Sequence, residues 1–239
     1  MRYAIYYTPA ERDPLTVLAT SWLGRSAFTG ESTPPRAIGR LPAAEVAYHT
    51  AAARRYGFHG TILAPFTLAD GETEHGLRAA LDAFCEAQDA FCVPRVVITR
   101  LDGFFALVPE TPSQALNGLA RDVVVAFDRF RAPLSEAERT RRSATHLSPS
   151  QLRNLMQWGY PYVFEDFRFH MTLTGRVDEA EAVRVHRAIE EHFGPVLEEP
   201  LEVGSLALFL ETEPGAPFVV RSLHQFDIVA ESETQRKTA

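Results

Sequence analysis

The stretch FHGTILAPF at residues 58–66 decides the fold when it is set beside FRFHMTLT at residues 167–174. Each stretch reads as a β-strand that contains a His-x-Thr triplet. Side chains two residues apart in a strand point to the same face, so the His and Thr of a triplet share one face and their apolar neighbours share the other. The two strands therefore present four polar side chains: His59, Thr61, His170 and Thr172.

The duplication of this triplet is not explained by chance. A chain with 8 histidines contains roughly 0.6 His-x-Thr triplets by chance. Requiring Phe before the histidine and Ile or Leu after the threonine lowers that expectation to the order of 0.01, and this chain has two such triplets. We therefore expect the two triplets to serve one site.

Each motif strand opens the same order of elements. A helix with an apolar stripe follows the strand, and a pair of apolar strands follows the helix. Asp102 and Gly103 separate the first pair of strands and are a strong hairpin-turn signal. The predicted helices and hairpins are residues 73–87, 95–101 and 104–108 in the first copy, and residues 179–193, 201–210 and 218–229 in the second.

The remaining elements precede the first copy or lie between the two copies. We predict a strand at 2–7, helices at 15–23, 43–55 and 113–130, and a loop at 29–42. The sum is an α+β fold with two largely antiparallel sheets and flanking helices. We expect a single domain of two similar lobes, roughly residues 1–135 and 136–230, between which strands can exchange, followed by a frayed tail at 231–239.

The composition narrows the classes of protein to consider. Apolar residues at 46% and charged residues at 23% are ordinary for a globular protein and argue against disorder. The formal charge of −7 argues against a stable nucleic-acid complex, because such binding requires the neutralisation of many phosphates. We find no secretory or membrane-spanning apolar run, so we expect a cytoplasmic protein with no membrane partner.

Two histidines at one site suit the cleavage of a phosphodiester. An attacking water must lose a proton while the departing alkoxide gains one, and two imidazoles can act as base and acid. The threonine hydroxyls can donate to the phosphoryl oxygens on which negative charge builds up. The sequence does not say which histidine is the base. If the two titrate together, we expect a bell-shaped rate profile around neutral pH.

Paired His-x-Thr motifs, one in each half of the chain, resemble those of the 2H (two-histidine) phosphoesterase superfamily, which includes RNA cyclic phosphodiesterases and RNA ligase-like enzymes. The resemblance implies a bilobal, pseudo-twofold fold with both motifs facing a central cleft. Four stretches are also similar to a bacterial branch named for phosphonate metabolism: RRYGFH (54–59), FRAPLS (130–135), WGYPY (158–162) and FHMTLTGR (169–176). This branch implies a cyclic phosphodiesterase that opens a cyclic ribose phosphate.

Five side chains near the motifs are candidates for binding a small phosphorylated substrate. They are Tyr6, Arg55, Tyr162, Arg168 and Arg176. For the arginines the alternative is a solvated salt bridge, and for the tyrosines it is packing in the core. The loop at 29–42 is a candidate for a lid. The stretch that contains the arginines at 139, 141 and 142 reads first as the charged face of a helix and second as a lid over an anionic ligand.

Other interpretations stay open at this point. The histidines are also possible metal ligands, but neither motif has a second carboxylate or histidine two to four residues away on the same face, so we expect no metal and no cofactor. A non-catalytic module that binds nucleotides or RNA ends is a second alternative, and the intact threonines argue against it. A 2′-5′ RNA ligase or cyclic phosphodiesterase acting on oligonucleotides is a third, and the acidic net charge argues against it. The six other histidines lack the duplicated context, so we assign them no role. The oligomeric state is not predicted.

Overall fold

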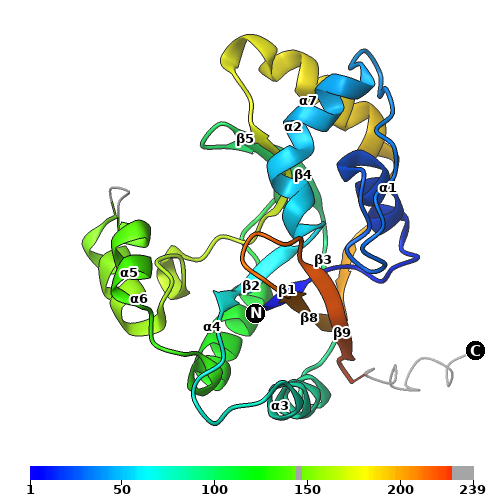
Figure 1. Ribbon diagram of the computed structural model, residues 1–239. Helices are drawn as coiled ribbons and strands as arrows, with labels where there is room; N and C mark the ends of the chain where they lie inside the picture. Colours follow the sequence, from blue (N-terminus) through cyan, green and yellow to red (C-terminus); the bar gives the residue numbers. More distant parts are fainter. Residues whose placement is uncertain (144–146, 228–239) are drawn as a thin grey trace, which may run out of the picture.

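The computed structural model describes residues 1–143 and 147–227, which form nine strands and seven α-helices (Figure 1). The strands are β1 (Arg2–Tyr7), β2 (Gly60–Phe66), β3 (Phe91–Val93), β4 (Val96–Leu101), β5 (Phe104–Pro109), β6 (Met171–Arg176), β7 (Leu201–Val203), β8 (Ser205–Glu211) and β9 (Val219–Gln225). The helices are α1 (Pro14–Leu23), α2 (Ala43–Tyr56), α3 (Glu74–Glu86), α4 (Gln114–Phe127), α5 (Glu136–Ser143), α6 (Pro149–Trp158) and α7 (Glu179–Phe193). Within these described ranges, no helix is long and apolar enough to cross a membrane.

Seven strands form one antiparallel sheet in the order β4-β5-β6-β2-β1-β8-β9. Its two halves meet at β2 and β6, which are joined by a single residue pair, Gly60 with Met171. The hairpin that follows each motif strand in sequence belongs to the opposite half of the sheet: β4-β5 pairs with β6, and β8-β9 pairs with β1, the neighbour of β2. Strands β3 and β7 form a separate two-stranded sheet.

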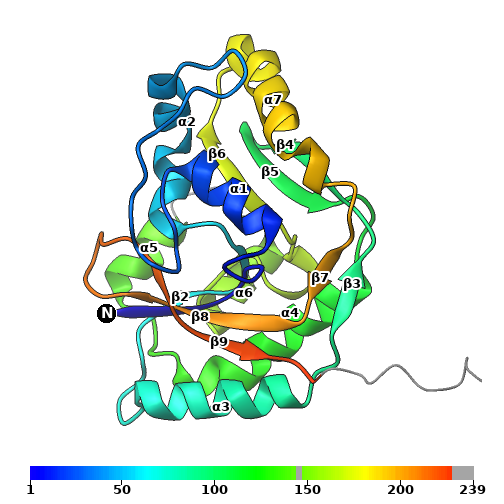
Figure 2. The ribbon, with the colours of Figure 1, turned by 90° about the vertical axis from the view of Figure 1, so that its right-hand side faces the viewer.

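The helices cover the two halves of the sheet separately, as Figures 1 and 2 show. Helices α3 and α4 pack on the half that contains β2, and α1, α2 and α7 pack on the half that contains β6. Helix α3 is typical, because its apolar stripe of Leu77, Leu81 and Cys85 is fully buried. Helix α5 packs against α6.

The predicted α+β class and the antiparallel strands are confirmed. The two sheets that were predicted are the two halves of the seven-stranded sheet, which are joined edge to edge at β2 and β6. Each motif strand begins one residue after its histidine, at Gly60 and at Met171. The strand predicted at 201–210 is divided at Gly204, because Leu201–Val203 pairs with β3 instead of the large sheet. The end of the last predicted strand and the predicted tail lie beyond residue 227, outside the described residues.

The joint between the halves depends on a glycine. A Cβ atom on Gly60 would lie 2.4 Å from the ring of Phe169, closer than real Cβ contacts allow. The ring occupies this space in the core, where Phe58 and Met171 are also buried. The apolar face of each motif strand therefore packs across the joint and holds the two histidine-bearing turns together.

Candidate active site

The two His-x-Thr triplets meet at the joint between the halves of the sheet. The middle residues of the two triplets form the pair that joins β2 to β6. This antiparallel register sets His59 opposite Thr172 and Thr61 opposite His170, with all four side chains on one face of the sheet. Directly opposite residues have Cβ atoms about 5 Å apart, so each histidine has both threonines within reach of one small ligand.

His59 is held in one tautomer. Its Nδ1 donates to the carbonyl oxygen of Gly57 at 2.9 Å, and its Nε2 lies 3.2 Å from the hydroxyl oxygen of Thr61. Because a carbonyl can only accept, Nδ1 carries the proton and Nε2 is the acceptor in the neutral ring. The ring of Tyr6 stacks on the imidazole with centroids 3.9 Å apart. The contact fixes the orientation of the ring, so Nε2 has a defined direction.

His170 repeats the arrangement. Its Nδ1 donates to the carbonyl oxygen of Arg168 at 2.8 Å, which is again the carbonyl two residues earlier. The ring of Phe104 lies 5.8 Å away between centroids. Both catalytic candidates therefore have Nδ1 bonded to the backbone and Nε2 left for chemistry.

The environment of His59 disfavours its protonated form. The half-buried ring lies among Tyr6, Tyr56 and Phe209, with centroids 3.9, 6.2 and 6.0 Å away. This desolvation lowers the pKa of His59 to about 4, although the bond to Gly57 acts in the opposite direction, and the charge of His170 lowers it further. His59 is consequently neutral at pH values around 7.

A pocket of about 550 Å³ lies over this face of the sheet. Among the predicted site residues, the pocket is lined by His59, Thr61, Thr172, Tyr6 and Tyr162. His170 is not among its lining residues, although Thr172, two residues on, is. The described lining includes two arginines and no carboxylate. In a chain with a formal charge of −7, this is a local preference for an anion.

The pocket is also lined by residues that were not among the predicted binding residues, including Arg2, Tyr56, Arg142 and Tyr160. Arg2 is four residues before Tyr6 on the first strand, and this even spacing was an available signal. Tyr56 and Tyr160 lie inside the stretches RRYGFH and WGYPY, and Arg142 was considered only as part of a lid. Arg142 is half-buried and donates to the carbonyl oxygens of Gly159 and Pro65.

The structure does not bring three of the predicted arginines to the pocket. Arg55 forms an ion pair with Glu211, Nη2 to Oε1 at 2.5 Å. Arg168 supplies its backbone carbonyl to His170 while its side chain is exposed. Arg176 donates to the carbonyl oxygen of Asp102 at 2.9 and 3.1 Å. A strand rises about 3.3 Å per residue, so Arg176 is at the far end of β6 from the motif.

Three tyrosines give the pocket neutral hydrogen-bonding groups. In the described part of the chain, the hydroxyls of Tyr6, Tyr56 and Tyr160 have no hydrogen-bond partner. Burial raises the pKa of Tyr160 to about 12 and also raises the pKa of Tyr6. The hydroxyls of Tyr6 and Tyr160 are therefore protonated and available to a ligand.

A family model described as a protein of unknown function, DUF1045, matches residues 61–219, which is more than half of the chain. The chain belongs to the DUF1045 family. Two curated proteins are similar to this DUF1045 chain, and both are named "Ribose 1,5-bisphosphate phosphokinase PhnN". The protein from Janthinobacterium sp. (strain Marseille) is 40% identical over 222 residues, 91% of this chain and 49% of that protein. The protein from Laribacter hongkongensis (strain HLHK9) is 36% identical over 218 residues, which are 91% of this chain and 50% of that protein. The chain thus spans about half the length of these curated relatives.

Two solved structures align with most of this DUF1045 chain. One is described as the crystal structure of a phosphoesterase, with 13% identity, a TM-score of 0.42 and coverage of 94% of this chain and 98% of that chain. The other is E. coli LigT complexed with NADP+, with 13% identity, a TM-score of 0.37 and coverage of 94% and 96%.

Proposed function

We propose that this DUF1045 chain is a phosphodiesterase in which His59 and His170 transfer the protons. The observation that carries the proposal is the shared setting of the two rings, each of which donates from Nδ1 to a carbonyl two residues earlier and keeps Nε2 for the reaction. The antiparallel register adds a threonine opposite each histidine. Such an arrangement can flank a phosphorus atom with a base and an acid.

In the proposed reaction His59 is the general base and His170 the general acid. The lowered pKa of His59, about 4, keeps its Nε2 ready to accept a proton from the attacking water. The water oxygen bonds to phosphorus, the bond from phosphorus to the departing alkoxide breaks, and His170 protonates the alkoxide. Thr61, which contacts Nε2 in the free chain, turns its hydroxyl toward a phosphoryl oxygen, and Thr172 does the same.

The proposed mechanism uses no metal ion. Among the described residues, one group of three His, Cys, Asp or Glu side chains is close enough to hold a metal: Glu45, His49 and Glu181. None of these residues lines the pocket. Two imidazoles can supply both proton transfers, so the chemistry does not require a Lewis acid.

The names of the relatives support a substrate class. Hydrolysis of a diester that bridges O1 and O2 of ribose 5-phosphate, with cleavage at O2, yields ribose 1,5-bisphosphate, the compound in the relatives' name. We assign the kinase activity in that name to the half of the relatives that this chain does not match. This chain has one lysine, Lys237, and lacks the GxxxxGK[ST] phosphate loop of such kinases. We infer that the diester is a cyclic ribose phosphate.

The lining of the pocket fits a substrate with a second phosphate. Arg2 and Arg142 can donate hydrogen bonds to the 5-phosphate while the His-x-Thr pairs bind the cyclic diester. The hydroxyls of Tyr56 and Tyr160 can form hydrogen bonds with the ribose. The tyrosines also favour a second candidate substrate, an RNA end whose base stacks on them.

The test is hydrolysis of 5-phosphoribose 1,2-cyclic phosphate with a chelator present, followed by phosphorus NMR. We expect ribose 1,5-bisphosphate to form at the same rate with and without the chelator. Activity abolished by the chelator would contradict the metal-free mechanism. Binding without turnover would identify a binding module, and faster cleavage of an RNA 2′,3′-cyclic phosphate end would identify the oligonucleotide substrate.

The pH dependence of kcat/KM should show the lowered pKa of His59. A base must be deprotonated to act, so its activity is lost as pH falls through its own pKa. We expect the acidic limb of the profile near pH 4, and not near the ordinary histidine pKa of 6.5. This expectation differs from the profile around neutral pH that the sequence predicts. An acidic limb between about pH 6 and 7 would contradict the assignment of His59 as the base.

A further inference from the structure

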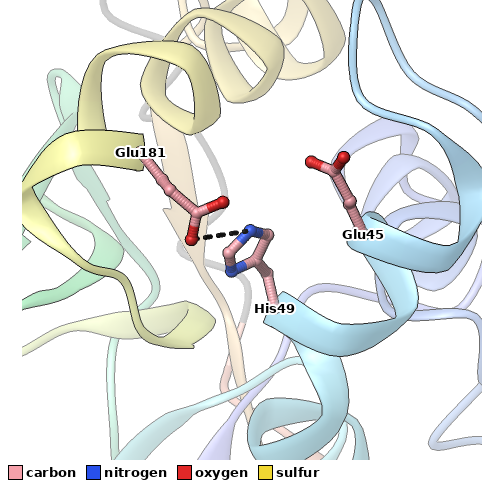
Figure 3. Close-up of side chains that lie close together, drawn as sticks. All are labelled: Glu45, His49 and Glu181. Atoms are coloured by element: carbon pink, nitrogen blue, oxygen red, sulfur yellow. Dashed lines mark ion pairs between the residues drawn. The ribbon is translucent and has the colours of Figure 1, made fainter.

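A second histidine cluster lies between helices α2 and α7, away from the pocket. Glu45 and His49 are one helical turn apart on α2, and Glu181 is in the first turn of α7. Figure 3 shows the imidazole between the two carboxylates. One ligand atom from each residue lies within 4.8 Å of the others. An i, i+4 pair on one helix with a third group from a neighbouring helix can surround an ion.

The buried histidine of this cluster lacks a hydrogen-bond partner in the described part of the chain. His49 is 3% exposed, and it makes no hydrogen bond within the described ranges. Four buried side-chain polar atoms of the described residues make no hydrogen bond, and one of them is Nδ1 of His49; another, Oε2 of Glu45, is in an ion pair with Arg184. Buried polar groups are nearly always satisfied, so an unsatisfied histidine between two carboxylates points to a missing ligand.

Arg184 neutralises only part of the negative charge of Glu45 and Glu181. Its guanidinium contacts Oε2 of Glu45 at 2.5 Å and Oε1 of Glu181 at 3.0 Å. Oε2 of Glu181 faces Nε2 of His49 at 4.0 Å, beyond hydrogen-bond distance. Two carboxylates and one guanidinium leave a net negative charge beside the imidazole. A cation is therefore favoured at this position.

We propose that Glu45, His49 and Glu181 bind a zinc ion that joins α2 to α7. One imidazole nitrogen and two carboxylate oxygens are zinc ligands, and water can complete a tetrahedron. A tetrahedral zinc ion holds its ligand atoms roughly 3.4 Å apart, so side-chain rotation within the present 4.8 Å closes the site. Helix α2 also supplies Tyr56 to the pocket, so the ion steadies one pocket wall without contacting the substrate.

The test is the melting temperature of chelator-treated protein with and without added zinc. We expect zinc at a hundredfold excess over its dissociation constant to raise Tm by roughly 5 °C, because the ion binds only the folded chain. Calorimetric titration should give one bound ion. His49→Gln and Glu181→Gln should each remove most of the Tm increase, and either variant suffices if the other does not fold.

Two controls separate this cluster from the other histidines. His186→Gln changes a more exposed histidine on α7 and should keep the full zinc response. His59→Gln should also keep it, since the pocket histidine is not a ligand in this proposal. A Tm increase that survives in both His49→Gln and Glu181→Gln, or that disappears in His59→Gln, would overturn the proposal. An increase in Tm on acidification alone, with no response to zinc, would also overturn it.

Discussion

His59→Asn is expected to lower kcat about 10³-fold, and His170→Asn by a similar factor. Asparagine can keep the N–H bond to the carbonyl two residues earlier, which is 2.9 Å from Nδ1 in His59 and 2.8 Å in His170. It has no group at the position of Nε2 that can carry a proton. The variant therefore separates proton transfer from the local structure of the turn.

The measurement is single-turnover hydrolysis of the cyclic ribose phosphate, with substrate binding followed separately. His186→Asn is the matched control, because it makes the same replacement on α7 outside the pocket and should leave kcat unchanged. The double variant should lose little more than either single variant, since two groups that act in one transition state are not additive. Full activity of either single variant, with a Tm equal to that of the unchanged chain, would refute the paired mechanism.

The elements around the site could be predicted because their signals are local. Residues two apart share a face of a strand, so the His-x-Thr triplets identified both polar faces directly. The β4-β5 turn is equally local, because Asp102 and Gly103 adopt the positive φ angles of 45° and 94° that such a turn requires. Helix α3 followed from its apolar period and from Thr73, whose side chain caps its first turn.

The pairing of distant segments could not be predicted in this way. Two hairpins of similar pattern compete for the same strand edges, and the choice depends on packing across the whole sheet. Arg55 and Arg176 flank the motifs in sequence, but their side chains bond to Glu211 and to the Asp102 carbonyl. Arg2 reaches the pocket from a strand that precedes the first motif by more than fifty residues. Its position depends on a partner 209 residues away, which no local pattern indicates.

That partner, Glu211, gives the largest expected effect on stability. Glu211 is fully buried and accepts hydrogen bonds from Arg2, Arg55 and the backbone N–H of Gly215. Glu211→Gln should lower the free energy of unfolding by about 3 kcal/mol, because two arginines lose their counter-ion. The value is at the low end for a buried pair, since the side chains of Arg2 and Arg55 are 23% and 36% exposed and water screens them.

The pH dependence of this effect has a defined sign. Burial alone would raise the pKa of Glu211, but the hydrogen bonds from Arg2 and Arg55 outweigh it and lower the pKa from 4.5 to about 2. A carboxylate with a depressed pKa stabilises the fold above its unfolded pKa and loses that contribution as pH falls toward the folded value. Urea unfolding should therefore show a gap between the unchanged chain and Glu211→Gln at neutral pH that narrows below about pH 4.

Glu213→Gln is the control for this gap, because Glu213 is an exposed glutamate two residues away. It should unfold like the unchanged chain at every pH. Arg2 lines the pocket and is anchored by Glu211, so Glu211→Gln should also raise KM for the substrate while the chemical step changes less. Equal unfolding free energies at neutral pH would show that the arginines find other partners. A KM equal to that of the unchanged chain would remove Arg2 from the proposed phosphate site while leaving the histidine pair in place.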